Sequence, residues 1–156
     1  MSRPVTLLVS ALGGEGGRVL ADWLVAAASD AGVGVQATSI PGVAQRTGST
    51  TYYLEFVRTG DCGPRPTLSL YPVIGDVDLY AASELLEVGR AIANGFVTPD
   101  RTTVVAADHR IYTIAERIAM GDGRYDRDKI VCAATEMAKT LHLLDLQGAV
   151  DRKSVV

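Results

Sequence analysis

The chain has 156 residues, a length that suits one domain with a hydrophobic core of its own. Its 47% hydrophobic and 21% charged residues are the balance of an ordinary globular protein and argue against a disordered chain. The net charge of −3, with both signs scattered, excludes a broad basic face for nucleic acid, and no apolar run is long enough to span a membrane.

The first forty residues have the pattern of strand, loop, helix and strand. Residues 5–10 (VTLLVS) are apolar and rich in β-branched side chains, which predicts a central strand buried on both faces. A glycine-rich loop follows at 11–17 (ALGGEGG), and residues 33–40 (VGVQATSI) predict a second strand. Between them a helix ending near Gly32 is predicted by the spacing of Val19, Leu20, Trp23, Leu24 and Ala27. These elements predict one right-handed βαβ unit.

The middle of the chain predicts further strands. Residues 49–58 (STTYYLEFVR) alternate and are rich in Thr and Tyr, as strands are. After a turn at 59–66, the segment 67–74 (TLSLYPVI) is expected to return as an antiparallel strand. Residues 76–82 (DVDLYAA) predict a short strand that is apolar at its end.

A helix is expected directly after this short strand. Ser83 is its predicted N-cap, and Glu84 in the first turn complements the helix dipole. Gly95 is expected to end the helix, one face of which carries Leu85, Gly89 and Ile92.

The last third contains another predicted strand and a final helix. Residues 102–107 (TTVVAA) form the strand, while 110–116 (RIYTIAE) fit a strand or a helix. The loop at 120–128 offers Asp126 or Asp128 as a helix cap. An amphipathic helix is predicted by Ile130, Val131, Ala134, Met137, Ala138 and Leu141.

The alternation of strands and helices predicts an α/β fold. We expect three layers around a mostly parallel, Rossmann-like sheet, with one antiparallel hairpin near residues 49–73. No repeat or low-complexity tract is visible, so residues 1–156 are expected to form a single domain.

The location of the protein is predicted from two negative observations. The apolar run near the N-terminus is too short for a signal-peptide core, and no good cleavage site follows it, so we expect a cytoplasmic protein. Cys62 and Cys132 match no metal-binding spacing; reduced thiols are the simplest interpretation, with a single disulfide left open.

The glycine loop is the first candidate site. Gly13, Gly14, Glu15 and Gly16 join a strand to a helix, where backbone N–H groups at the positive helix end accept phosphate or carboxylate. However, the spacing is not G-x-G-x-x-G, Glu15 adds a negative charge, and no acidic residue closes the second strand. Three interpretations stay open: a tight turn that packs helix on strand, an anion site, and a contact with a partner chain.

The segment 42–49 (GVAQRTGS) is the second candidate. Arg46 offers a planar fork of donors for carboxylate or phosphate, and Gln45 adds a donor and an acceptor. The small residues around them permit close approach of another backbone. The alternative is a solvated surface loop. The position at the carboxyl end of a strand favours binding, because open α/β sheets bind ligands there.

The remaining polar groups predict no catalytic set. His109, between Asp108 and Arg110, fits a general base or, more commonly, a hydrogen-bonded loop histidine, since no nucleophile is evident nearby. His142 is expected at the surface, and residues 121–128 lack the spacing of a calcium loop. No serine–histidine, thiol–histidine or metal cluster stands out, so we expect no catalytic residue and no metal in this chain.

Two motifs resemble a known family. The loop ALGGEGG (11–17) followed by IPGVAQRTGSTTYYLEF (40–56) is similar to the gamma-type domain of the 2-oxoacid:ferredoxin oxidoreductases. Members carry a G-x-G-G-Q-G loop and a later A-Q-R-G-G-S-like segment. The segments 75–92 and 98–108 also match, and the resemblance spans about residues 5–130. Within the family, the beta subunit of indolepyruvate ferredoxin oxidoreductase is most alike.

The chain departs from the family pattern at three positions. Glu15 stands where the family has Gln, Leu12 replaces a Gly, and Thr47 replaces the first Gly of R-G-G. The chain also stops soon after its last predicted helix, so it is either a small separate subunit or a domain of a longer chain.

The resemblance implies a reaction shared with other subunits. A 2-oxoacid, here an arylpyruvate such as indolepyruvate, is decarboxylated on thiamine diphosphate, electrons pass through iron–sulfur clusters to ferredoxin, and the acyl group goes to coenzyme A. The resemblance implies that this chain binds none of these cofactors alone and packs against the catalytic subunit. The residues expected to face that partner or an anionic ligand are Gly13, Gly14, Glu15, Gly16, Gln45, Arg46, Thr47, Gly48 and Ser49.

Two further expectations accompany this interpretation. An isolated chain would expose its partner-facing apolar surface, which favours self-association. The alternative function is a stand-alone nucleotide- or anion-binding α/β module that uses the glycine loop.

Overall fold

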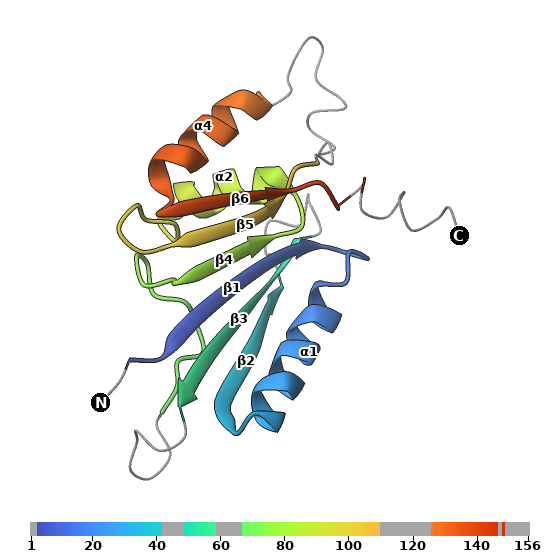
Figure 1. Ribbon diagram of the computed structural model, residues 1–156, viewed down its shortest axis with the longest axis vertical. Helices are drawn as coiled ribbons and strands as arrows, with labels where there is room; N and C mark the ends of the chain where they lie inside the picture. The colour runs from blue at the N-terminus through green and yellow to red at the C-terminus, as the bar shows by residue number, and fades with distance from the viewer. Residues whose placement is uncertain (1–2, 42–48, 59–66, 110–125, 147, 149–156) are drawn as a thin grey trace.

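The structure is a computed structural model that describes residues 3–41, 49–58, 67–109, 126–146 and 148. Its strands form one six-stranded sheet (Figure 1). In chain order they are β1 (Val5–Leu12), β2 (Val33–Pro41), β3 (Ser49–Arg58), β4 (Leu79–Ala82), β5 (Thr103–Ala107) and β6 (Thr140–Leu144). Across the sheet the order is β2-β3-β1-β4-β5-β6. Strands β1, β4, β5 and β6 are parallel, and β3 is antiparallel to β1 and β2, which confirms the predicted fold class.

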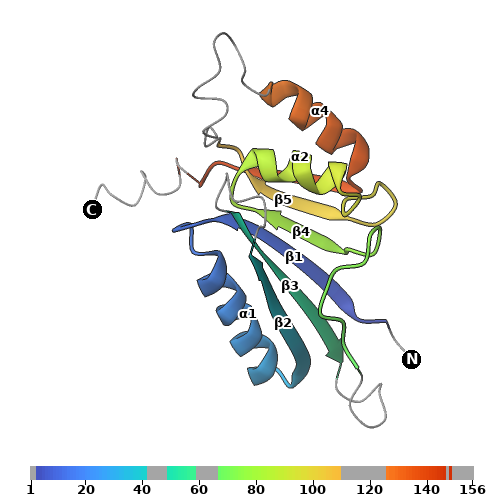
Figure 2. The ribbon, with the colours of Figure 1, turned by 180° about the vertical axis from the view of Figure 1, so that it is seen from behind.

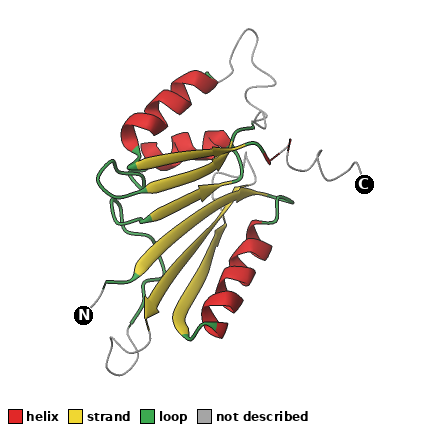
Figure 3. Cartoon of the chain, viewed as in Figure 1, coloured by secondary structure: helices red, strands yellow, loops and turns green. Residues whose placement is uncertain are grey.

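The helices cover opposite faces of the two halves of the sheet. The described helices are α1 (Gly17–Asp30), α2 (Leu85–Ala93) and α4 (Arg127–Met137). Helix α1 packs on β1, β2 and β3, whereas α2 packs on β4 and β5 and α4 packs on β6 (Figures 2 and 3). The result is three layers, with a different helix layer on each half. No described helix has the length and apolar character needed to cross a membrane.

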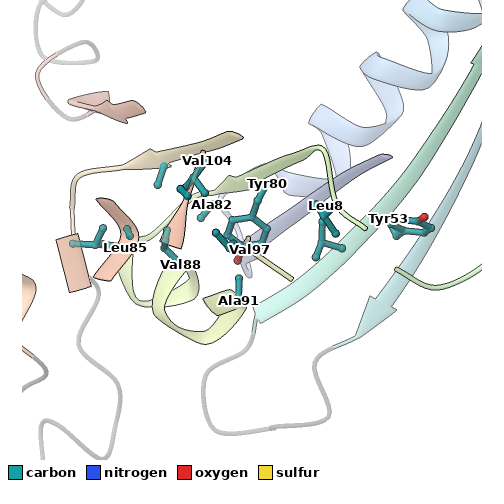
Figure 4. Packing of buried hydrophobic residues seen from close by; sticks show 13 residues of the cluster. Leu8, Tyr53, Tyr80, Ala82, Leu85, Val88, Ala91, Val97 and Val104 are labelled. Atoms are coloured by element: carbon teal, nitrogen blue, oxygen red, sulfur yellow. The ribbon is translucent and has the colours of Figure 1, made fainter. Parts of the chain in front are cut away.

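Alternation along the strands divides the core in two. Leu7 and Val9 of β1 pack with Ala21 of α1, while Leu8 between them packs in a larger cluster on the face of α2. Successive side chains of a strand point to opposite faces, so β1 serves both cores and is buried on both sides, as its sequence predicts. Figure 4 shows the larger cluster, which includes Tyr80, Leu85, Val88, Val97 and Val104.

Tyr80 and Tyr53 are the largest side chains in this core, and Tyr80 is the more deeply buried of the two. It is 1% exposed, and its hydroxyl donates a hydrogen bond to the main-chain carbonyl of Glu87 at 2.9 Å. Burial raises the pKa of Tyr80 far above its ordinary value, because a phenolate would lose its hydration there. The Tyr80 hydroxyl can donate this hydrogen bond only while it is protonated.

The predicted pairing of the first βαβ unit differs from the structure in one respect. β2 does not neighbour β1, because β3 inserts between them, antiparallel to both. The antiparallel hairpin is therefore formed by β2 and β3, not by residues 49–73. Residues 67–74 are not a strand. Their backbone is held by side chains: Ser69 N–H donates to the Glu55 carboxylate at 2.8 Å, and the Gln36 amide donates to the Ser69 carbonyl at 3.0 Å.

The last predicted helix is in fact a helix and a strand. α4 begins after Asp126, whose carboxylate accepts from Asp128 N–H as a predicted cap, and it ends at Met137. Ala138 is extended, and Lys139 N–H donates to the Thr102 carbonyl at 2.9 Å, so the chain enters the sheet. Leu141 therefore belongs to β6, paired with β5, and not to the helix.

The face of α1 that packs on the sheet is not the one predicted from its large apolar residues. Gly17 and Ala21 are buried, whereas Trp23 is 70% exposed and Val19 and Leu20 are also exposed. A Cβ at position 17 would overlap Ala11 and touch the ring of Tyr52, so the helix lies too close to β1 for larger side chains. Small residues make the closest contact, Leu24 and Val25 pack partly against the same core, and Val19, Leu20 and Trp23 are left outside it.

Candidate functional site

The chain reverses direction across the sheet between β1 and β4. β1 leads into α1 on one face and toward β2, while β4 leads into α2 on the other face and toward β5. In open α/β sheets such a topological switch point opens a crevice at the carboxyl ends of the two strands, where ligands bind. The loops after β1, β4 and β5 all meet at this edge.

The glycine loop takes its shape from two left-handed residues. Gly14 has φ +90° and Gly16 has φ +76°, a conformation that side chains rarely adopt. Between them, Glu15 N–H donates to the Leu12 carbonyl at 3.1 Å, which closes the turn at the end of β1. This geometry turns the Glu15 side chain back toward the sheet, and not out to solvent.

The Glu15 carboxylate occupies the switch-point crevice. It accepts a hydrogen bond from the Ser83 hydroxyl and from Leu12 N–H at 3.3 Å, and Leu12 N–H also donates to Ser83 Oγ at 3.2 Å. His109 Nε2 lies 3.5 Å from Glu15 Oε1. One carboxylate thus connects the loops that follow β1, β4 and β5. We call Glu15, Ser83 and His109 the crevice cluster.

The order of groups in the crevice cluster does not fit nucleophilic catalysis. A catalytic serine needs the imidazole beside it to take its proton, with the carboxylate behind the imidazole. Here the carboxylate lies between Ser83 and His109. The His109 main-chain carbonyl also accepts from Leu85 N–H at 3.2 Å, so the residue ties its loop to the start of α2. The arrangement is that of a hydrogen-bonded loop histidine, except that Nδ1 is buried without a partner among the described residues.

A small hollow adjoins the crevice cluster on the side of α1. Its volume is about 200 Å³, below the roughly 300–1,000 Å³ of sites that enclose a drug-sized ligand. Apart from Glu15 and Ser83 at one end, its lining is apolar or glycine: Val9, Ala11, Gly16, Gly17, Leu20, Ala81, Ala82, Val105, Ala106, Ala107, Leu144 and Leu146. The hollow suits an aliphatic or aromatic side chain and not a dinucleotide.

The second candidate segment, residues 42–49, leads into β3, which begins at the same edge of the sheet. Leu12, at the end of β1, is the register partner of Ser49, and Pro41 pairs with Thr50. Ser49 therefore lies beside the end of β1, where the glycine loop begins. Gln45, Arg46, Thr47 and Gly48 fall outside the described residues. Of this segment the structure describes only Ser49, whose hydroxyl points inward.

Ser49 donates to Glu87 Oε2 at 3.1 Å, and both side chains are buried. Glu87 is also paired with Arg90, so its charge is compensated at the surface of α2. This contact joins the start of β3 to α2 beneath the edge. The Ser49 side chain therefore links β3 to α2, and its hydroxyl is not exposed to a ligand.

The sequence prediction missed Ser83 as part of this edge. Ser83 is not the cap of α2: the Glu84 carboxylate accepts from Leu86 N–H at 2.9 Å instead. Ser83 is free to reach Glu15 because Glu84 satisfies the helix end. The signal that could have found it is position, since Ser83 directly follows β4 and His109 comes two residues after β5, both parallel strands.

Asp108 and Cys132 take no part in a site among the described residues. Asp108 is hydrogen-bonded to Arg127 of α4, and this contact raises the pKa of Arg127. Cys132 is an exposed free thiol, and Cys62 falls outside the described residues. No group of three or more His, Cys, Asp or Glu side chains in the described ranges is placed to hold a metal ion.

Comparisons with known proteins agree with this fold. The family model described as pyruvate ferredoxin/flavodoxin oxidoreductase matches residues 6–151. Subunit PORC of pyruvate oxidoreductase from Thermotoga maritima has a similar structure, with a TM-score of 0.55 and 14% identity over 92% of this chain. This chain spans only 63% of that subunit's length. No curated protein matches the chain.

A second solved structure covers the same part of the chain. It is the 2-oxoglutarate:ferredoxin oxidoreductase from Magnetococcus marinus, with 2-oxoglutarate, coenzyme A and succinyl-CoA bound. The TM-score is 0.49 and the identity 16%, over 92% of this chain and 20% of that one.

Proposed function

The chain belongs to the pyruvate ferredoxin/flavodoxin oxidoreductase family, and from this premise we propose that it is a non-catalytic gamma-type subunit or domain of a 2-oxoacid:ferredoxin oxidoreductase. The observation that carries the proposal is the family match over residues 6–151, nearly the whole chain. We propose that residues 1–156 form one such domain, acting in the cytoplasm beside a catalytic subunit. The 2-oxoacid is an arylpyruvate such as indolepyruvate, because GVAQRTGS resembles the indolepyruvate branch.

The cofactors of this reaction belong to the partner. Iron–sulfur clusters are held by four protein ligands, usually cysteine thiolates, and this sequence has two cysteines in all. The crevice cluster offers no nucleophile with an adjacent base. Thiamine diphosphate and the clusters therefore lie on the catalytic subunit, which passes electrons to ferredoxin and the acyl group to coenzyme A. The role of this chain is to pack against that subunit and to shape its site.

We propose that the carboxyl edge of the sheet is the working edge of the subunit. The glycine loop, Gly13 to Gly16, follows β1, and the segment from Gln45 to Ser49 leads in sequence into β3, whose first residue, Ser49, is the register partner of Leu12. Arg46 is proposed to meet a carboxylate or phosphate of the partner or of a bound ligand, since its guanidinium forms paired hydrogen bonds with such groups.

The test is reconstitution with the catalytic subunit. The chain alone is expected to show no turnover. Mixed with the thiamine- and cluster-bearing subunit, it should support 2-oxoacid-dependent reduction of a viologen dye, with a higher kcat/KM for indolepyruvate than for pyruvate or 2-oxoglutarate. Arg46→Ala should lower turnover without lowering the melting temperature, and Arg46→Lys serves as the charge-retaining control. Turnover by the isolated chain, or no complex with the catalytic subunit, would contradict the proposal.

The alternative, a stand-alone anion-binding module, has less support. The Glu15 carboxylate lies where an anion would enter the crevice, and like charges repel strongly in a partly buried site. Calorimetry of the isolated chain with coenzyme A, flavin mononucleotide and a dinucleotide separates the two functions. Micromolar binding of any of these would favour the module over the subunit.

A further inference from the structure

Among the residues that the structure describes, helices cover one half of the sheet on one face only. Parallel strands are normally buried on both faces and are apolar on both. β5 has this composition (TVVAA), and its Val104 and Ala106 are buried under α2 and α4. On the opposite face, Val105 lies between Ala81 of β4 and the exposed His142 of β6 and remains partly exposed. The only described helix on that side, α1, packs on β1, β2 and β3 instead.

The exposed side of α1 that borders this uncovered strip is also apolar. Leu20 lines the hollow together with Val105 and Leu144, so this flank of α1 is directed toward β5 and β6. Trp23 follows Leu20 by three residues and therefore lies on the same side of the helix. The opposite flank is polar, with Arg18 paired to Asp22. Of the exposed apolar side chains of α1, Leu20 thus faces β5 and β6, and Trp23 lies on the same side of the helix.

We define the open face by its members: Leu20, Trp23, Ala81, Val105, Leu144 and Leu146. Trp23 is 70% exposed, and Leu20, Leu144 and Leu146 are 42–44% exposed. Together they offer on the order of 400 Å² of apolar surface, about half of the roughly 800 Å² that each partner buries in a stable complex. The remainder of an interface is normally a polar rim. The area and composition are those of the centre of a protein interface.

We propose that the open face is the docking surface for the catalytic subunit, which covers β4, β5 and β6 with an amphipathic helix. The inference rests on the proposed function and names the surface through which the subunit acts. A helix is the occupant that α/β sheets place on parallel strands, and the small, partly exposed side chain of Ala81 lets it approach closely. Its apolar stripe meets Trp23 and Leu144, and a basic residue at its end meets Glu15.

Charge disfavours a second copy of this chain as the occupant. The chain has a net charge of −3, and Glu15 is the charged residue in the lining of the hollow. A two-fold contact through the open face would bring two identical acidic rims together, which is unfavourable. A partner with a basic residue at that position is complementary.

The test compares two equally exposed aromatic residues on opposite faces. Trp23→Asp places a charge in the open face. Tyr71→Asp is the matched control, because Tyr71 is 63% exposed and lies beyond Ser69, which is bonded to Glu55 on the face of α2. Binding of each variant to the thiamine-bearing catalytic subunit is measured by calorimetry, and its mass in solution by light scattering. We expect Trp23→Asp to weaken binding at least thirtyfold and Tyr71→Asp to change it less than twofold, with melting temperatures within a few degrees of the wild type.

The other outcomes overturn the inference in distinguishable ways. If the wild-type chain binds and Trp23→Asp binds equally well, the docking surface lies elsewhere while the proposed function stands. If the wild-type chain does not bind the catalytic subunit at all, the proposed function itself fails. A wild-type dimer that Trp23→Asp converts to a monomer, with binding unchanged, assigns the face to a second copy.

A second variant keeps the test decisive if Trp23→Asp lowers the melting temperature. Leu144→Ser, at the end of β6, removes apolar area from the same face without adding a charge. Weaker binding by Leu144→Ser at an unchanged melting temperature supports the docking surface. A fall in melting temperature with unchanged binding for both variants means that the chain covers this face itself, and the inference is wrong.

Discussion

The two faces of β5 differ although their side chains are alike. Val104 points to the face covered by α2 and is fully buried, whereas Val105, the next residue, points to the open face and stays partly exposed. The strand sequence does not distinguish them, and the difference comes only from which helices lie above. One face therefore holds the fold together, and the other is the face that we propose for docking.

The largest expected effect is a difference in the free energy of unfolding between alanine variants of these two valines. Val104→Ala removes buried methyl groups and leaves a cavity, at a cost of about 2.5 kcal/mol in the free energy of unfolding. Val105→Ala should cost less than about 1 kcal/mol, because its methyl groups are already partly hydrated. Urea unfolding of both variants measures the difference. Equal losses would mean that the two faces are equally covered and would break the comparison.

The substitution Gly17→Ala tests why α1 packs on the first half of the sheet and not on the second. A methyl group at this position would overlap Ala11 and touch Tyr52, so Gly17→Ala is expected to destabilise the chain by about 2 kcal/mol through overpacking. Thermal unfolding measures it, with Ala26→Gly on the exposed side of α1 as a control that costs about 1 kcal/mol through helix propensity. If Gly17→Ala were stabilising, the close approach of α1 to β1 would not exist.

The smallest expected effect is the alkaline loss of stability from the covered face. Burial raises the pKa of Tyr80 above that of an unfolded tyrosine, which is about 10. The unfolded chain therefore releases this proton first, so the contribution of Tyr80 is complete below pH 10 and is lost as the pH rises. The loss is about 1.4 kcal/mol per pH unit above 10. Denaturant unfolding from pH 9 to 11.5 measures the slope.

Two substitutions identify the source of that slope. Tyr80→Phe should flatten it, because no titrating hydroxyl remains beneath α2. Tyr71→Phe is the matched control, because Tyr71 lies on the surface and outside the core. A slope that survives Tyr80→Phe would assign the alkaline transition to another buried group such as Tyr53, whose pKa burial and the Glu55 hydrogen bond also raise.

Local sequence patterns were sufficient to predict those elements that depend only on their own residues and near neighbours. β1 and β5 are apolar runs rich in β-branched residues and are strands. Gly32 and Gly95 follow α1 and α2 with positive φ, as predicted, and Asp126 caps α4 with its own carboxylate. These features depend on backbone conformation and on contacts a few residues apart, so a single sequence contains them.

Long-range competition decided the rest. β3 enters between β1 and β2, and Leu141 pairs with β5 instead of extending a helix, because ladder partners far away in the chain were available. Glu84 took the cap predicted for Ser83, which left Ser83 to meet Glu15 across the crevice.

The amino-acid sequence alone determined the fold class, the glycine loop and the family resemblance, since these depend on periodicity, turn chemistry and motif order. Only the tertiary structure decided that Trp23 lies outside the core and that no described helix packs on one face of β4 to β6. The reason is physical: burial is a property of what packs above a residue, and a strand with two apolar faces does not state which of them a helix will cover.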